Sequence, residues 1–160
     1  MVFREVHTAS DILPAYAGTP IADLLSSHAL GVDVGTPESV TTLIVSCMDP
    51  RIRLDIPERF AFQLRTAGAT PEPLMTNVAF AVGVAGVRSI AVIGHTDCAM
   101  CRAAACADQM VDHLVSNEGW NADYAANERA ALNDVFKIDD AAEATVAHVC
   151  LLYTSPSPRD

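Results

Sequence analysis

The segment that decides the fold is residues 40–51, VTTLIVSCMDPR, an apolar run that ends in a cluster of reactive side chains. Residues 40–46 are almost all apolar or β-branched, a composition typical of a parallel strand buried on both faces. The segment 89–98, SIAVIGHTDC, has the same arrangement, with a predicted buried strand followed by polar side chains. Between them, the alternating pattern FAFQLR at residues 60–65 predicts a further strand.

A helix is predicted between the second and third strands. Pro73 lies in its first turn and Gly86 ends it. Apolar residues recur at helical spacing along one side, which we expect to belong to the core (Leu74, Val78, Ala81, Val82, Ala85). Strand, helix and strand in this order imply a right-handed crossover. The predicted fold class is therefore α/β, with a mainly parallel β-sheet flanked by helices.

The chain divides into three predicted segments. Residues 1–39 form an N-terminal arm with short helical signals broken by Pro and Gly, and residues 40–150 form the α/β domain. The last part of that domain, from residue 99 onwards, is Ala-rich and predicted to be helical. Residues 151–160, LLYTSPSPRD, have no periodicity and resemble a translated sequencing adapter, so we expect a non-native or disordered tail.

Charge and hydropathy restrict the partners and the location of the protein. Twenty acidic against ten basic residues give a net charge of −10, which disfavours nucleic acid and anionic membrane surfaces as partners. Without a signal peptide or an apolar run of about 18 residues, the chain is expected to be cytoplasmic. Thiols stay reduced there, so its five cysteines are expected to be metal ligands or buried thiols.

Two groups of reactive side chains each follow a predicted strand. Cys47, Asp49 and Arg51 follow the first strand, and His95 and Cys98 follow the third. Parallel strands end at the same edge of a sheet, which is where open α/β folds hold ligands. This topology brings Cys47, His95 and Cys98 together. Two thiolates and one imidazole form a natural zinc-binding set that leaves a fourth position free for water.

At these positions the sequence resembles the β-class carbonic anhydrases, whose signature is the pair C-x-D-x-R and H-x-x-C. The two motifs stand here as CMDPR at residues 47–51 and HTDC at residues 95–98, and RTAGA at residues 65–69 resembles the family's R-N-A-G segment. The resemblance implies a homodimer or higher homo-oligomer, one zinc per subunit and the reversible hydration of carbon dioxide to bicarbonate and a proton. It assigns Cys47, His95 and Cys98 as metal ligands and Asp49 and Arg51 as the catalytic pair.

The charges of the implied site give that pair a role. Zinc with two thiolates is formally neutral, so its water is expected to lose a proton above the pKa of about 7 found in favourable zinc sites. Activity should therefore rise with pH. Asp49 would block the open position if it bound the metal, and a bidentate bond from Arg51 holds it back. Asp49 can then accept a hydrogen bond from the reactive water.

Several alternatives remain open at this point. The family continues through a further strand with a V-x-G-x-x-Y-D-like ending that this sequence lacks, which implies a C-terminally truncated member. Thr66 and Ala99 replace the usual Asn and Gly. Relatives with the same site hydrolyse carbonyl sulfide or carbon disulfide. A non-catalytic zinc protein closed by Cys101 or Asp49, and a thiol redox protein using Cys98-x-x-Cys101, are further alternatives.

The remaining polar residues carry weaker signals. Arg65 is interpreted equally well as a site residue or a subunit contact, and Gly68 equally well as a site residue or the mark of a tight turn. Asp97 is interpreted either as a residue that orients a metal ligand or as a cap of the following helix, and we favour the cap. In that helix Cys101 should point away from the metal. Cys106 and Cys150 are expected to be buried or half-buried. Surface or packing roles are expected for the other histidines (His7, His28, His113, His148).

Overall fold

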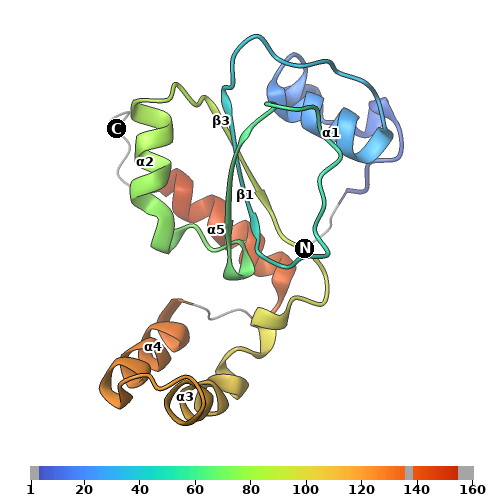
Figure 1. Cartoon of the computed structure of the whole chain (residues 1–160). Helices are drawn as coiled ribbons and strands as arrows, with labels where there is room; N and C mark the ends of the chain where they lie inside the picture. Colours follow the sequence, from blue (N-terminus) through green and yellow to red (C-terminus); the bar gives the residue numbers. More distant parts are fainter. Residues whose placement is uncertain (1–3, 136–138, 155–160) are drawn as a thin grey trace.

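A three-stranded parallel sheet lies at the centre of the computed structural model, which describes residues 4–135 and 139–154 (Figure 1). The strands are β1 (Thr42–Cys47), β2 (Phe62–Thr66) and β3 (Ser89–Ile93), in the order β2-β1-β3. The predicted α/β fold with parallel strands is therefore confirmed.

The strands differ in burial because only one of them has a neighbour on each side. All six residues of β1 are buried, and Val45 pairs with Leu64 of β2 and with Val92 of β3. The β3 strand is half-buried along its whole length. The prediction of a fully buried third strand is wrong, because within the described residues β3 pairs with β1 alone.

Helices cover both faces of the sheet (Figure 1). The α-helices are α1 (Pro20–Leu30), α2 (Met75–Gly83), α3 (Ala107–Ser116), α4 (Ala122–Val135) and α5 (Ala141–Thr154). Short 3-10 helices are η1 (Ala9–Asp11), η2 (Pro14–Tyr16), η3 (Ala67–Ala69), η4 (Glu72–Leu74), η5 (Ala99–Arg102) and η6 (Ala104–Cys106). The α3 and α4 helices pack on each other away from the sheet. None of the helices described here is long and apolar enough to cross a membrane.

Alternate residues of β1 build two apolar cores. Leu43 and Val45 pack on one face with residues of α2, and Ile44 packs on the other face with Leu24 of α1. Each fully buried side chain of this size contributes about 1.5–3 kcal/mol of transfer free energy. The helix of the predicted 1–39 arm is thus packed directly on the sheet.

One residue of the apolar face predicted for the α2 helix, Val82, lies outside the core. Val78 and Ala81 are buried, whereas Val82 is 44% exposed. Val78 and Ala81 define the middle of the buried face, and Val82 lies about 70° around the helix from that middle, on the side of Val78. The predicted core position of Val82 is therefore wrong.

The α5 helix covers the end of β3 with an inner face that contains Ala141, Thr145, His148 and Leu152. Leu152 packs against the Leu43–Val45 core, and the helix continues through Thr154. The first residues of the predicted 151–160 tail thus lie in α5. Residues 155–160 lie outside the described residues.

Gly94 allows α5 to lie close to the end of β3. A Cβ atom at this position would overlap Thr145 Oγ1 and would lie 3.2 Å from Thr145 Cβ and 3.4 Å from the Ala141 carbonyl oxygen. Rotation of the Thr145 side chain is restrained because its hydroxyl donates a hydrogen bond to the same carbonyl at 2.7 Å. The absence of a side chain at residue 94 therefore sets the distance between the helix and the strand.

We expect Gly94→Ala to destabilise the protein by about 1–3 kcal/mol, because the added methyl group overpacks this contact. Urea unfolding measures the change. Gly83→Ala is the matched control, since a Cβ at Gly83 meets nothing within 4 Å. A second substitution, Thr145→Ala, should restore part of the loss. Equal stability of the Gly94 and Gly83 variants would contradict this interpretation.

His148 is an unexpected polar group on the inner face of α5. It is only 9% exposed, and its Nε2 atom lies 3.5 Å from Thr70 Oγ1. Its Nδ1 atom is buried without a hydrogen-bond partner among the described residues. Burial lowers the pKa of His148, and the nearby Glu72 carboxylate offsets part of this effect. The folded protein therefore favours the neutral imidazole.

This burial predicts a loss of stability in mild acid. In the unfolded chain His148 takes up a proton near its ordinary pKa of 6.5, whereas the folded protein takes it up only at lower pH. The free energy of unfolding should therefore decrease as the pH falls below about 6.5. Urea midpoints across this range should show a smaller decrease for His148→Gln. The exposed His113 provides the control, and an equal effect of His113→Gln would contradict the assignment.

Candidate metal centre

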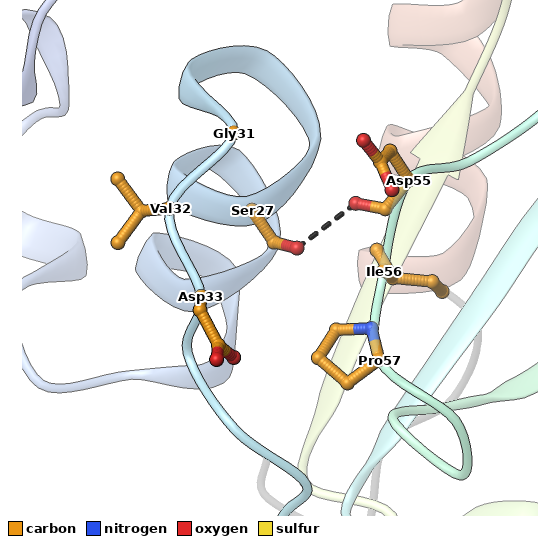
Figure 2. Close-up of a pocket in the computed structure, with 7 residues that line it drawn as sticks. All are labelled: Ser27, Gly31, Val32, Asp33, Asp55, Ile56 and Pro57. Atoms are coloured by element: carbon orange, nitrogen blue, oxygen red, sulfur yellow. Dashed lines mark hydrogen bonds between the residues drawn. The ribbon is translucent and has the colours of Figure 1, made fainter.

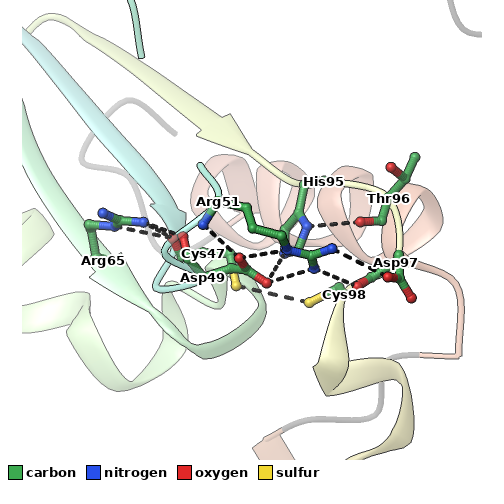
Figure 3. A network of polar contacts seen from close by, with 8 residues as sticks. All are labelled: Cys47, Asp49, Arg51, Arg65, His95, Thr96, Asp97 and Cys98. Carbon is green, nitrogen blue, oxygen red and sulfur yellow. Dashed lines mark hydrogen bonds and ion pairs between the residues drawn. The ribbon is translucent and has the colours of Figure 1, made fainter. Parts of the chain in front are cut away.

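The ends of β1 and β3 bring three potential metal donors together (Figure 3). Cys47 is the last residue of β1, and His95 and Cys98 follow β3. The Cys47 and Cys98 Sγ atoms lie 3.9 Å apart, and one donor atom from each of the three residues lies within 4.8 Å of the others. The juxtaposition expected from parallel strand ends is present in the structure.

The orientation of His95 leaves one ring nitrogen free for a ligand. Its Nδ1 atom lies 2.9 Å from the Thr96 carbonyl oxygen, which can only accept a hydrogen bond. Nδ1 therefore carries the proton, and Nε2 presents its lone pair. Nε2 is buried and has no hydrogen-bond partner among the described residues. A metal ion would satisfy this atom.

The donor set fits zinc. Two sulfurs that each lie about 2.3 Å from one tetrahedral zinc are about 3.8 Å apart, close to the observed separation of Cys47 and Cys98. Burial raises the pKa of the Cys98 thiol, and the neighbouring thiols of Cys47 and Cys101 raise it further. A hydrogen bond from the Met100 backbone lowers this pKa and offsets part of the increase. A cation would have to displace thiol protons, so metal affinity is expected to fall at low pH.

Arg51 holds Asp49 beside the three donors. Its Nε and Nη2 atoms donate to the two carboxylate oxygens of Asp49 at 2.9 and 2.8 Å, and its backbone N–H donates to Oδ1 at 2.9 Å. These hydrogen bonds hold the pKa of Asp49 well below its usual range. Asp49 Oδ2 is 3.9 Å from His95 Nε2. Asp49 is nevertheless outside the group of three mutually close donors. A tetrahedral zinc bound by these three would keep a fourth position for water.

Arg65 stabilises the loop that carries Asp49. Its guanidinium donates to the carbonyl oxygen of Cys47 through Nε at 3.2 Å and Nη2 at 3.1 Å, and to the Asp49 carbonyl at 2.6 Å. The side chain thereby fixes the backbone between the metal donor and the carboxylate. Gly68 adopts φ 65°, in agreement with the tight turn expected there.

Asp97 has a different role from the predicted helix cap. The N-cap residue of η5 is Cys98, and no side-chain capping bond is present. Asp97 instead contacts Arg51, with its Oδ2 atom 3.3 Å from Nη1 and its carbonyl oxygen 2.9 Å from Nη2. The prediction failed because a local pattern cannot show a partner 46 residues away.

The other cysteines lie outside the donor group. Cys101, expected to point away from the metal, is half-buried and packs against the Cys47–Cys98 cluster. It is not among the mutually close donors, so the structure favours three ligands from the described chain over a closed tetrad. Cys106 and Cys150, expected to be at least half-buried, are exposed.

A pocket of about 540 Å³ opens beside the donors. Apolar side chains of α5 and Cys101 form part of its wall, but Asp97, Arg102 and Asp139 also line it. The lining is therefore partly apolar and partly charged. The α5 helix begins at this pocket, where the Asp140 carboxylate accepts hydrogen bonds from the backbone N–H groups of Ala142 and Glu143.

A smaller pocket of about 260 Å³ lies between α1 and the segment 55–57 (Figure 2). The Ser27 hydroxyl donates across it to the Asp55 carbonyl oxygen at 2.9 Å. The carboxylates of Asp33 and Asp55 are exposed there, and no metal-donor group of the described chain includes them. We interpret this pocket as a packing gap between the helix and the loop.

Comparison with known proteins agrees with this geometry. A sequence-family model described as carbonic anhydrase matches residues 42–153. The chain belongs to the β-class carbonic anhydrase family. The match includes all three strands, both motifs and most of α5, and so extends well beyond the segment that carries the motifs.

The fold of this chain is also similar to that of a solved carbonic anhydrase. The carbonic anhydrase from Glaciozyma antarctica aligns with a TM-score of 0.55 and 23% sequence identity, covering 91% of this chain and 86% of that chain. At this identity the likeness shows a shared fold. No curated protein matches the sequence. The substrate and the metal of this carbonic anhydrase family member must therefore be argued from its own residues.

Proposed function

We propose that this chain is a zinc-dependent carbonic anhydrase that interconverts carbon dioxide and bicarbonate. The observation that carries the proposal is the arrangement of Cys47, His95 and Cys98 around an open fourth position, with Asp49 held beside it by Arg51. When bound, zinc supplies a Lewis acid that lowers the pKa of a water molecule in the open position.

The residues of the chain would orient that water. Asp49 remains a carboxylate because Arg51 stabilises its charge, so it can only accept a hydrogen bond. By accepting a hydrogen bond from the water, Asp49 would fix the direction of the water's oxygen lone pairs. Arg65 keeps the Asp49 backbone in place through its contacts with the two carbonyl oxygens.

Stopped-flow hydration of carbon dioxide by the zinc-loaded protein, from acid to alkaline pH, tests the proposal. We expect turnover that rises with pH. Two thiolate ligands would neutralise the charge of the zinc, so the pKa of its water would be lowered less than in a site with neutral ligands. If the protein binds one zinc per chain but shows no turnover at any pH, the proposal is contradicted. The same protein should then be assayed with carbonyl sulfide and carbon disulfide, the alternative substrates of this type of site.

We also propose that the protein forms a homodimer or a higher homo-oligomer. Several large apolar side chains are exposed on a single chain, including Phe80 and Val84 of the α2 region, and Val84 is 71% exposed. Exposed apolar residues of this size favour association when they lie in one patch. Sedimentation equilibrium measures the mass, and a monomer at micromolar concentration would contradict the proposal.

A further inference from the structure

The guanidinium of Arg51 is held on two edges (Figure 3). One edge makes the bidentate contact with Asp49, at 2.9 and 2.8 Å. The other edge contacts Asp97, where Nη2 donates to the carbonyl oxygen at 2.9 Å and Nη1 to Oδ2 at 3.3 Å. Arg51 therefore connects the loop after β1 with the loop after β3.

The backbone of Asp97 is suited to this contact. Its φ of 54° lies in the left-handed region, which Asp and Asn adopt more readily than other residues with a side chain. This conformation lets both the carbonyl and the carboxylate face Arg51. The Asp97 side chain is 72% exposed, so its ion pair adds little to overall stability. Its effect is on the position of Arg51.

We propose that Asp97 is a positioning residue that anchors Arg51 and thereby keeps Asp49 out of the fourth metal position. Asp49 Oδ2 is only 3.9 Å from His95 Nε2, so a small movement would bring it among the donors. A metal cation attracts this carboxylate, and Arg51 competes with the metal for it. An Arg51 side chain anchored on Asp97 cannot move with Asp49 towards the metal donors. Asp49 would have to break its contact with Arg51 to reach them. The inference rests on the proposed metal site.

The binding of a small anion to the cobalt-substituted protein tests the proposal. Azide requires the open position, and visible absorption of the bound Co²⁺ reports its binding. Asp97→Gly removes the carboxylate and tolerates the left-handed backbone. We expect it to weaken azide binding about two- to fivefold, the range that a surface ion pair supplies. Asp97→Asn keeps the backbone and an oxygen acceptor, so a smaller loss is expected.

The direction of the change in azide affinity distinguishes a positioning role of Asp97 from a simple effect of its charge. Removing a negative charge near the site should strengthen the binding of an anion, whereas loss of the anchor should weaken it. Asp108→Asn is the matched charge control, because Asp108 forms a surface ion pair with Arg129 at 2.6 Å outside the site. This control should leave azide affinity unchanged or slightly raised.

A double substitution identifies the carboxylate that competes with azide. In an Asp49→Ala background, Asp97→Gly should no longer weaken azide binding, because no carboxylate is left to take the open position. Unchanged or tighter binding in the single Asp97→Gly variant would overturn the proposal, as would an equal loss in the Asp49→Ala background. A chain that binds no cobalt would overturn it as well.

This test is independent of carbon dioxide turnover. Cobalt and azide binding report the open position alone. A wild-type protein that binds azide without hydrating carbon dioxide would contradict the proposed function. The azide affinities of the variants would still decide whether Asp97 positions Arg51.

Discussion

Substitution of Cys98 by alanine is expected to reduce zinc affinity by at least about 100-fold. Loss of a residue that hydrogen-bonds to a metal ligand already lowers metal affinity 10–100-fold in comparable sites. Loss of a ligand itself should lower it by more. The variant keeps Cys47 and His95, which are two donors and a single thiolate. Competition with a chromophoric chelator at neutral pH measures the affinity, and zinc per chain should fall from one towards zero.

Cys106→Ala is the matched control for this experiment. Cys106 is an exposed cysteine on η6 and lies outside the group of three donors. Its substitution should leave zinc affinity unchanged, and circular dichroism should show that both variants fold. If Cys98→Ala kept wild-type affinity, the metal would have to be held by other residues.

Substitution of Arg51 by alanine is expected to lower carbon dioxide hydration by at least about 100-fold while zinc remains bound. Loss of one aligned hydrogen-bonding group at an active site commonly costs 100- to 1000-fold in turnover. The variant loses the bidentate contact that holds Asp49, and Asp49 is then free to occupy the open position. Arg51→Lys keeps the charge but cannot make the bidentate contact, so it should restore only part of the activity.

The control for Arg51 is an arginine that forms an ion pair away from the donors. Arg129 pairs with Asp108 at 2.6 Å on the α3–α4 pair, away from the donors. Arg129→Ala should keep wild-type turnover. Zinc content, measured on the same samples, separates loss of the metal from loss of Asp49 positioning. Full activity of Arg51→Ala would show that Asp49 needs no such restraint.

The strands could be predicted from the sequence because local composition determines them. The β-branched run at residues 40–46 and the apolar run at 89–94 became neighbouring parallel strands, with bounds within two residues of those predicted. The position of Cys47, His95 and Cys98 at one sheet edge followed from that topology alone. The roles of Asp49 and Arg51 in catalysis remain predictions, although the structure pairs the two side chains.

Packing details could not be predicted in the same way. Val82 and Val78 look equivalent at helical spacing, and only the angle at which α2 meets the sheet exposes one and buries the other. His148 gave no signal as an isolated residue, yet its spacing from Ala141, Thr145 and Leu152 places all four on one face of α5. That periodicity is the signal that could have identified it as a core residue.

The sequence by itself determined the parallel sheet, the approximate strand bounds and the meeting of the three donors, because these depend on local pattern and chain topology. Only the tertiary structure decided that Arg65 binds the carbonyls of Cys47 and Asp49, that Asp97 anchors Arg51, and that Gly94 admits α5 against β3. These contacts join residues distant along the chain. Their hydrogen-bond directions and distances depend on how loops and helices pack, which no local pattern encodes.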